Sequence, residues 1–253
     1  MMKMTDTVKQ LLIINVIFYI GSNFVGKVAY TMFSMYYPGN PNFNFWQPLT
    51  SMFMHAEVPN FTHILFNMFA LYSFGSALEH FWGAKKFIFF YISCGLGAAL
   101  LHTAFGYYQF HLGMENLEAI GYQDQLASFL KTGSLNFSVT PPNLDAEALN
   151  NMYGAYNFPS LGASGAIYGL LTAFAFMFPN AQLGLMFIPI PIKAKYFVPG
   201  LLAVDLFLGF KGSSLFGSGG TGIAHFAHVG GAITGFLMMW IWKKNSFDKH
   251  RWN

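Results

Sequence analysis

The chain has 253 residues, of which 54% are hydrophobic and only 9% are charged. An ordinary soluble domain carries about 25% charged residues, so this composition excludes that class and indicates a membrane protein. The 30 phenylalanines exclude intrinsic disorder. The single cysteine, Cys94, excludes an intramolecular disulfide and a cysteine-based zinc site.

Six apolar segments are candidates for membrane-spanning helices, because about 20 helical residues cross the hydrocarbon core of a bilayer. We interpret the first as a retained helix, since it is long for a signal peptide and no small-residue cleavage site follows it. The fifth is the weakest candidate, because it is short and contains Asp205. In chain order the six segments are 11–32, 61–79, 87–105, 161–178, 196–210 and 223–242.

The connections between these segments differ in length and composition. We predict a polar extracytoplasmic loop at 107–158, with a short amphipathic helix somewhere within 113–131. The connection 179–195 contains three prolines, which prevent a straight helix, and we expect it at the membrane interface. No internal repeat is evident, so we predict a single membrane domain over 1–253 that ends in a short basic cytoplasmic tail at 243–253.

Positive charges are divided unevenly between the two sides of the membrane that these segments define. Because cytoplasmic loops are rich in Lys and Arg, the bias predicts that both termini are cytoplasmic. The net charge of +3 is therefore a topology signal, and we do not expect the chain to bind nucleic acid. One side carries Lys3, Lys9, Lys85, Lys86, Lys193, Lys195, Lys243, Lys244, Lys249 and Arg251, and the other carries only Lys27, Lys131 and Lys211.

Polar side chains inside a membrane are costly and often mark functional sites. Three groups stand out, near the start of the second, fourth and sixth segments. With both termini in the cytoplasm, these three segments all enter the membrane from outside, so the groups share one depth in the outer part of the bilayer. They are His63 with Asn67, Ser164 with Tyr168, and His225 with His228.

Glycines are spaced so that the fourth and sixth segments can pack closely. Gly165 with Gly169, and Gly231 with Gly235, each have the G-x-x-x-G spacing that lets two helix backbones approach. His228 lies on the face of Gly231 and Gly235, because residues three and seven apart share a helix face. This packing would bring its imidazole beside the serine hydroxyl of the fourth segment.

These residue types point to acyl-transfer chemistry. A serine hydroxyl is a weak nucleophile unless a neighbouring base takes its proton, and His228 is the candidate base for Ser164. The Ser164 amide at a helix start and the side chains of His63 and Asn67 are candidate donors for the oxyanion. We find no Asp or Glu at this depth and interpret Asp205 as a structural buried acid. The pattern therefore predicts a Ser-His dyad and not a Ser-His-Asp triad.

Other interpretations of the polar residues are weaker. His63, His225 and His228 could bind a metal, but we expect no carboxylate or cysteine to join them. His225, one turn nearer the surface than His228, is expected to be structural or to lie at the rim of the site. We expect His55 at the membrane interface and Glu79 in a structural position.

In these residues the sequence resembles the rhomboid family of intramembrane serine proteases, over about residues 45–240. Each of three motifs is weak alone, whereas their order and their assignment to helices make the combination specific. The motifs are His63-Ile-Leu-Phe-Asn67, Gly162-Ala-Ser164-Gly165 with Tyr168, and Ala227-His228-Val-Gly-Gly231 with Gly235.

The resemblance implies an all-α bundle of six membrane helices and a role for each motif residue. Ser164 would be the nucleophile and His228 the general base. His63, Asn67 and the Ser164 amide would bind the oxyanion, and Tyr168 would stack on His228 and orient it. No cofactor or metal is implied.

The first extracytoplasmic loop departs from the family pattern. The family often has Trp-Arg there, whereas here Gln47 follows Trp46. The loop must therefore be held differently.

We therefore predict a serine-type endopeptidase that cleaves membrane-spanning protein substrates within or next to their transmembrane segment. The resemblance implies an integral protein of a bacterial cytoplasmic membrane with the site facing outward. The glycine-rich stretch 209–222 and the fifth helix are predicted to form a lateral gate and cap. The alternatives are a catalytically silent rhomboid-like protein that binds or escorts membrane clients, and a small-solute transporter. The oligomeric state is left open.

Overall fold

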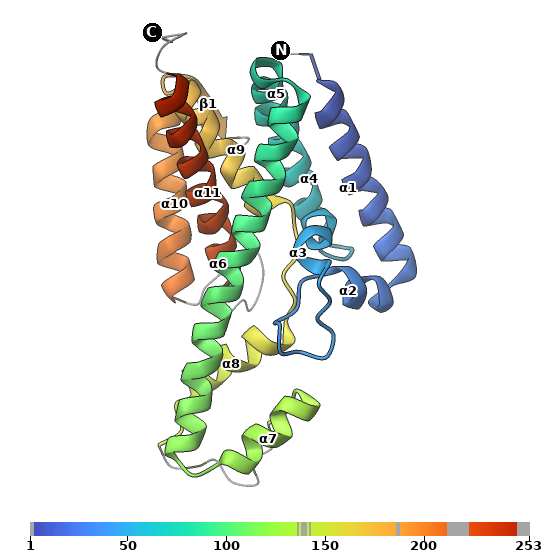
Figure 1. Ribbon diagram of the computed structural model, residues 1–253, viewed down its shortest axis with the longest axis vertical. Coiled ribbons are helices and arrows are strands. Elements are labelled where there is room, and N and C mark those ends of the chain that lie inside the picture. Colours follow the sequence, from blue (N-terminus) through green and yellow to red (C-terminus); the bar gives the residue numbers. More distant parts are fainter. Residues whose placement is uncertain are drawn as a thin grey trace.

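The computed structural model describes residues 3–135, 137, 141, 143–185, 188–211 and 223–246. This part of the chain is a bundle of helices with one small hairpin (Figure 1). The all-α fold class is therefore confirmed for the described residues. The predicted cap at 212–222 and most of the predicted basic tail lie outside them.

The first predicted segment is divided into two helices. Helix α1 (Asp6–Val25) is separated from α2 (Lys27–Phe33) by Gly26, whose φ of +72° is a backbone conformation that favours glycine. The prediction of one helix over 11–32 was therefore wrong at both ends. Gly26 ends α1, and contacts to Glu79 extend it to Asp6.

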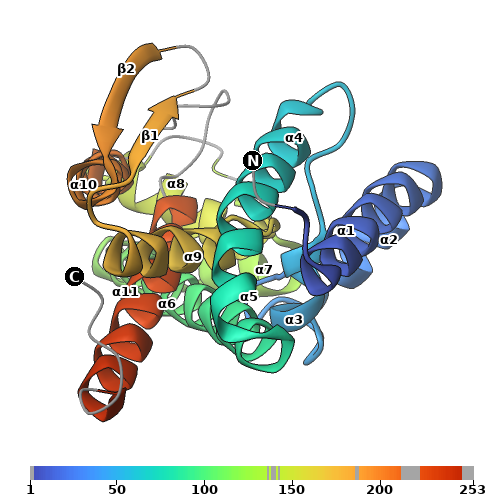
Figure 2. The same ribbon diagram turned by 90° about the horizontal axis from the view of Figure 1, so that it is seen from above.

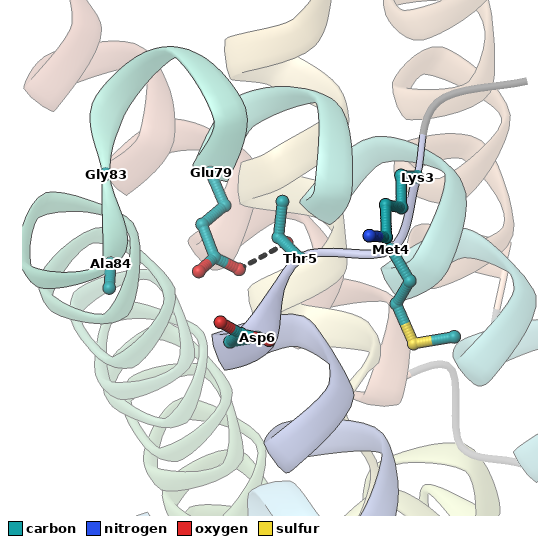
Figure 3. A pocket seen from close by; sticks show the side chains of 7 residues that line it. All are labelled: Lys3, Met4, Thr5, Asp6, Glu79, Gly83 and Ala84. Atoms are coloured by element: carbon teal, nitrogen blue, oxygen red, sulfur yellow. Dashed lines mark hydrogen bonds between the residues drawn. The ribbon is translucent and has the colours of Figure 1, made fainter.

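Glu79 caps the start of α1 from another helix. Its carboxylate accepts hydrogen bonds from the backbone N–H groups of Thr7 and Val8, at 3.0 and 2.9 Å. It also accepts one from the Thr5 hydroxyl, which Figure 3 shows. A helix start leaves its first N–H groups without intrahelical acceptors and is partly positive, so a carboxylate stabilises it. Glu79 therefore has the structural position that the sequence predicts.

The other predicted segments are helical at nearly the expected positions. The second becomes α4 (Thr62–Ala70), a π-helical turn η2 (Leu71–Gly75) and α5 (Ser76–Trp82). Two short elements, α3 (Gln47–Thr50) and η1 (Ser51–Phe53), precede it. The last three segments are α9 (Ser164–Met177), α10 (Ala194–Lys211) and α11 (Ile223–Ser246).

The segment 107–158, expected as a loop, is largely helical. Helix α6 runs over Ala84–Ala119, and α7 (Gln123–Thr132) and α8 (Ala146–Asn157) follow it. A short amphipathic helix is expected within 113–131, and α7 overlaps this range; Gly121, which has a φ of +81°, lies between α6 and α7. A second hydrophobic cluster holds these helices together, with Phe110 and Leu117 of α6, Leu126 and Phe129 of α7, and Leu149, Met152 and Tyr156 of α8.

The proline-containing connection after α9 forms an antiparallel hairpin. Strand β1 (Gln182–Leu185) pairs with β2 (Ile188–Lys193), with Leu183 opposite Ile192. The prolines exclude a helix here, and an edge strand tolerates them because its outward N–H groups need no partner. Figure 2 shows the hairpin and α1 on opposite sides of the bundle.

Helices α6, α9 and α11 contact one another and form the centre of the bundle, with α10 packed on α11 (Figure 2). Three helical segments of the described chain are long and apolar enough to span a membrane: Asp6–Val25, Ala84–Ala119 and Ala224–Lys243. Helix α9 is apolar but shorter. The beginning of α1 and the end of α11 lie at the same end of the molecule (Figure 1), an arrangement that the predicted orientation requires.

Candidate active site

Ser164 is the first residue of α9, directly after a tight glycine turn. Gly162 has a φ of +127°, and its N–H donates to the carbonyl of Ser51 at 2.9 Å. As the first residue of a helix, Ser164 has a backbone N–H without an intrahelical acceptor. The turn therefore presents both the hydroxyl and the amide of Ser164 on the same end of α9.

His228 reaches Ser164 from α11. Its Nε2 atom lies 2.9 Å from the Ser164 Oγ atom. The ring of Tyr168, one turn along α9 from Ser164, lies parallel to the imidazole, with centroids 4.3 Å apart and planes 6° apart. The ring is thus held on one face, with a nitrogen directed at the hydroxyl.

Asp205 contacts the other nitrogen of His228. Its Oδ1 atom lies 3.1 Å from His228 Nδ1 and 2.5 Å from His225 Nδ1. The expectation that Asp205 lies at a different depth was wrong. Asp205 is six residues before Lys211, where α10 ends, and His228 is five residues after Ile223, where α11 begins. These are about 9 and 7.5 Å along their helices, so the two side chains meet at one level.

His225 is a buried neighbour of the site and not a rim residue. It is 8% exposed, and the same carboxylate oxygen of Asp205 binds it. Its position three residues before His228 places both rings on the face of α11 that α10 covers. The structural part of the expectation for His225 fits this position, and the rim part was wrong.

His63 lies on the opposite side of the serine. The backbone N–H of Ala56 donates to its Nδ1 atom at 3.2 Å, so the ring proton is on Nε2. A Cβ atom on Gly162 would lie 3.1 Å from His63 Nε2 and 3.6 Å from Ser164 Oγ. The free N–H of the imidazole and the serine hydroxyl therefore border the same small space beside Gly162.

Asn67 supports His63 from the next turn of α4. Its Nδ2 atom donates to the His63 carbonyl at 2.7 Å, and the residue is 6% exposed. An amide nitrogen carries two hydrogens, so one remains beyond this bond.

His55 is a residue near the site that the sequence does not identify. Its side chain is fully buried inside the protein, and its expected position at the level of the membrane interface stays a prediction. Its Nε2 atom lies 2.9 Å from Asn15 Oδ1, and its ring packs edge-on against His63 with centroids 5.3 Å apart. His55 lies in the connection before α4, outside any helix, so its spacing from His63 gives no signal in the sequence.

Glycines bring the backbones of α9 and α11 together. A Cβ on Gly231 would overlap the carbonyl of Gly165, and one on Gly235 would lie 2.8 Å from the carbonyl of Gly169. Gly165 itself faces α6, where its Cβ would overlap Ala98. Gly231 and Gly235 thus let α11 approach the backbone of α9, while Gly165 lets α9 approach α6. These close contacts fix the position of Ser164 relative to His228.

Gln47 holds the loop that precedes α3. It is fully buried; its Nε2 atom donates to the carbonyls of Asn42 and Thr31, at 2.8 and 3.1 Å, and its Oε1 accepts from the Tyr36 N–H at 3.2 Å. Trp46 Nε1 donates to the Met32 carbonyl at 3.0 Å. A neutral amide, which can both donate and accept, therefore takes over the position in which the family often has arginine.

Asp205, His225 and His228 form a group whose ligand atoms lie within 4.8 Å of one another. The carboxylate that we did not expect beside the histidines is therefore present. Two nitrogen or oxygen ligands of one tetrahedral Zn²⁺ would lie about 3.4 Å apart. The 2.5 Å contact between Asp205 and His225 fits a hydrogen bond better than a pair of ligands on one ion.

Comparison with known proteins identifies the family. The family model of the Rhomboid domain matches residues 42–115 and 130–245, which is more than half of the chain. The matched residues include His63, Ser164, Asp205 and His228. The model leaves out 116–129, where α6 ends and α7 begins. The chain is also 29% identical over 153 residues to Rhomboid protein 1, mitochondrial, of Saccharomyces cerevisiae.

That alignment covers 56% of this chain and 40% of the yeast protein. The chain thus spans less than half the length of this relative. The match to the family model extends over the helices that carry Ser164 and His228. The chain is an integral membrane protein that belongs to the rhomboid family.

Proposed function

We propose that the protein is an intramembrane serine endopeptidase in which Ser164 is the nucleophile and His228 the general base. The observation that supports this proposal most strongly is the 2.9 Å distance between Ser164 Oγ and His228 Nε2. The parallel ring of Tyr168 favours the same role, because it keeps the imidazole in the orientation that proton transfer needs. Membership of the rhomboid family agrees with this chemistry.

The reaction would take two acyl-transfer steps. His228 Nε2 accepts the proton of Ser164 Oγ as the oxygen attacks a substrate peptide carbonyl. The imidazolium then gives this proton to the leaving amine, and an acyl ester remains on Ser164. Water then attacks the ester as His228 takes its proton, and the imidazolium returns that proton to Ser164 Oγ as the carboxylic acid product leaves. The chain's own side chains supply every proton transfer in this sequence.

The tetrahedral oxyanion would form in the space beside Gly162. Its donors would be the Ser164 backbone N–H, the His63 Nε2–H and the remaining amide hydrogen of Asn67. Loss of a single oxyanion donor costs about 100- to 1000-fold in rate in serine proteases. The hydrogen bond from the Ala56 N–H keeps the proton of His63 on the nitrogen that faces this space.

The substrates would be membrane-spanning proteins. A helical segment shields its carbonyls by intrahelical hydrogen bonds, so cleavage requires local unwinding near the membrane face. Substrates with small or helix-breaking residues there are favoured. We infer six membrane crossings with both termini cytoplasmic, which orients the site outward in a bacterial cytoplasmic membrane. The mitochondrial location in the yeast relative's name applies to that protein.

The second candidate is a rhomboid-like protein that binds or escorts membrane clients without cleaving them. A protein of that kind needs no serine and histidine at hydrogen-bond distance. The geometry of Ser164 and His228 therefore favours the protease.

Cleavage of a model single-span substrate by the purified full chain tests the proposal. Ser164→Ala and His228→Ala are each expected to lower the rate by at least about 1000-fold. Ser128→Ala and His111→Ala are matched controls in the α6–α8 region and should cleave like the wild type. A chain that binds the substrate without cleaving it would support the escort instead, and wild-type activity of Ser164→Ala would refute the nucleophile.

A further inference from the structure

We propose that Asp205 is a positioning residue that completes a Ser-His-Asp relay with Ser164 and His228. This inference rests on the proposed protease function and deepens it. It departs from the dyad that the sequence predicts, because the third group comes from α10, which no motif identifies.

The contacts form a continuous line of hydrogen bonds. Asp205 Oδ1 lies 3.1 Å from His228 Nδ1, and His228 Nε2 lies 2.9 Å from Ser164 Oγ. A carboxylate can only accept, so Nδ1 carries the ring proton and Nε2 presents its lone pair to the serine. Asp205 thus selects the tautomer that a general base requires. When Nε2 takes the serine proton, the ionised carboxylate stabilises the imidazolium without itself becoming protonated.

Asp205 is buried, so its contact with His228 is not a solvent-exposed ion pair. Asp205 is 4% exposed on a largely apolar helix, and carboxylates at membrane depth are costly. His225 binds the same oxygen at 2.5 Å and fixes the carboxylate from the α11 side. A purely structural tie between α10 and α11 needs only this bond to His225. The second bond, to His228, directs the carboxylate to the base.

Tyr168 and Asp205 act on different degrees of freedom of the same ring. The stacked phenol restricts the plane of the imidazole, with an angle of 6° between the rings. The carboxylate fixes which nitrogen carries the proton. Since Tyr168 already limits the ring orientation, removal of Asp205 should cost less than the roughly 10⁴-fold seen when a triad aspartate is replaced in soluble serine proteases.

The position of Asp205 also constrains any gate formed by α10. The carboxylate reaches His228 only while α10 is packed against α11. A gate that opened by displacing α10 would have to close again before proton transfer.

The test compares steady-state cleavage by purified full-length variants, with rates normalised to the folded fraction from thermal unfolding. Asp205→Asn is nearly isosteric and is expected to lower kcat about 100-fold with KM unchanged. Asp205→Glu should recover part of that loss because it restores the carboxylate. His225→Asn weakens the tie that holds the carboxylate between α10 and α11 and should lower the unfolding temperature. Its effect on kcat should be less than about 10-fold, and so smaller than that of Asp205→Asn, because the bond between Asp205 and His228 remains.

A double-mutant cycle separates positioning from structure. If Asp205 acts through His228, then Asp205→Asn should lower the residual rate of His228→Ala by less than about 2-fold. A full 100-fold loss in that background, or wild-type kcat of Asp205→Asn, would overturn the proposal. If Asp205→Asn does not fold, Asp205→Ser takes its place, and Asp205→Glu should cleave faster per folded molecule than Asp205→Ser. Equal rates of these two variants would overturn the proposal.

Three further results keep the inference distinct from its alternatives. Loss of activity on treatment with a chelator such as EDTA would overturn it, because the three side chains would then hold a metal. Wild-type cleavage by Ser164→Ala and His228→Ala would refute the protease function itself. Loss of cleavage in those two variants together with wild-type kcat of Asp205→Asn would refute the positioning role alone.

Discussion

The two halves of α6 differ in the residues that make their closest contacts. The first half has small residues beside the candidate site: a Cβ on Gly97 would overlap Thr234, and Ala98 lies against Gly165, while Phe90 packs on Trp242 near the end of α11. The second half faces α7 and α8 mainly with large residues, and Phe110 stacks on Tyr156 with centroids 5.6 Å apart.

Solvent explains this difference. A helix of 36 residues is about 54 Å long, whereas the hydrocarbon core is about 30 Å thick, so α6 extends well beyond it. Between helices in lipid, close backbone approach is the main source of attraction. Where water is the alternative, burial of aromatic side chains is favourable. The small-residue half fixes the geometry of Ser164 and His228, and the aromatic half stabilises a region that the family model does not fully match.

The largest expected effect comes from Gly231→Ala, which disturbs the small-residue packing. The new Cβ would overlap the carbonyl of Gly165, and a backbone group cannot turn aside. We expect a loss of about 3 kcal/mol or more in the free energy of unfolding, together with loss of cleavage, since α11 carries His228. Thermal unfolding in detergent and a cleavage assay measure the two effects.

Its matched control is Gly200→Ala on α10, where a Cβ would meet nothing within 4 Å. This variant should keep both stability and activity. If Gly231→Ala behaved like Gly200→Ala, the close contact of α9 and α11 would not be needed to hold the site.

Phe129→Ala tests the aromatic half. Phe129 is fully buried and packs against Tyr156 at a centroid distance of 4.9 Å. The substitution should lower the free energy of unfolding by about 3 kcal/mol, while cleavage per folded molecule changes less than about 2-fold. The next residue, Leu130, is 43% exposed, so the control variant Leu130→Ala should change the free energy of unfolding little. A large loss of specific activity in Phe129→Ala would show that the aromatic region controls the site.

Gly162→Ala should reduce activity more than stability. The added Cβ would lie 3.0 Å from the His63 ring and would occupy the space assigned to the oxyanion. We expect about a 100-fold loss of cleavage rate, or about 2.7 kcal/mol in the activation barrier. Gly121→Ala is a control for backbone strain, because its φ is +81° and its Cβ would meet nothing within 4 Å. Equal rate losses in the two variants would assign the effect to strain alone.

Gln47→Leu should have the smallest effect of the four. It leaves the carbonyls of Asn42 and Thr31 and the N–H of Tyr36 without this partner, at a cost of about 2 kcal/mol in the free energy of unfolding. Gln10→Leu, on an exposed position of α1, is the matched control. Unchanged stability of Gln47→Leu in a thermal unfolding assay would mean that the loop before α3 is held by other contacts.

The sequence predicts the apolar helices and the serine, histidine and tyrosine of the site, because these follow from hydropathy and helical spacing. It does not predict the extension of α6 or the presence of α8, since partly polar helices outside the bilayer have no long apolar run. The sequence does not predict the hairpin after α9, because its prolines exclude a helix but do not specify which residues pair as strands.

The error over Asp205 has a simple geometric origin. Depth along a helix has to be counted from the end that lies on the same side as the site. In the predicted orientation, Lys211 is the outer end of α10 and Ile223 the outer end of α11. The distance from Lys211 to Asp205 along α10 nearly equals the distance from Ile223 to His228 along α11, so the two residues lie at the same depth. The contacts of His55 and Gln47 could not be predicted for a different reason. The two residues lie in short connecting elements, and their partners are not related to them by any helical or strand period in the sequence.

The most direct measurement of the central claim is the identification of the residue that a serine-reactive fluorophosphonate modifies in the purified protein. Mass spectrometry of the labelled wild type should find the probe on Ser164, and the label should be lost in His228→Ala while the fold is retained. No labelling of the folded wild type, a probe on another serine, or equal labelling of Ser164→Ala would contradict the account.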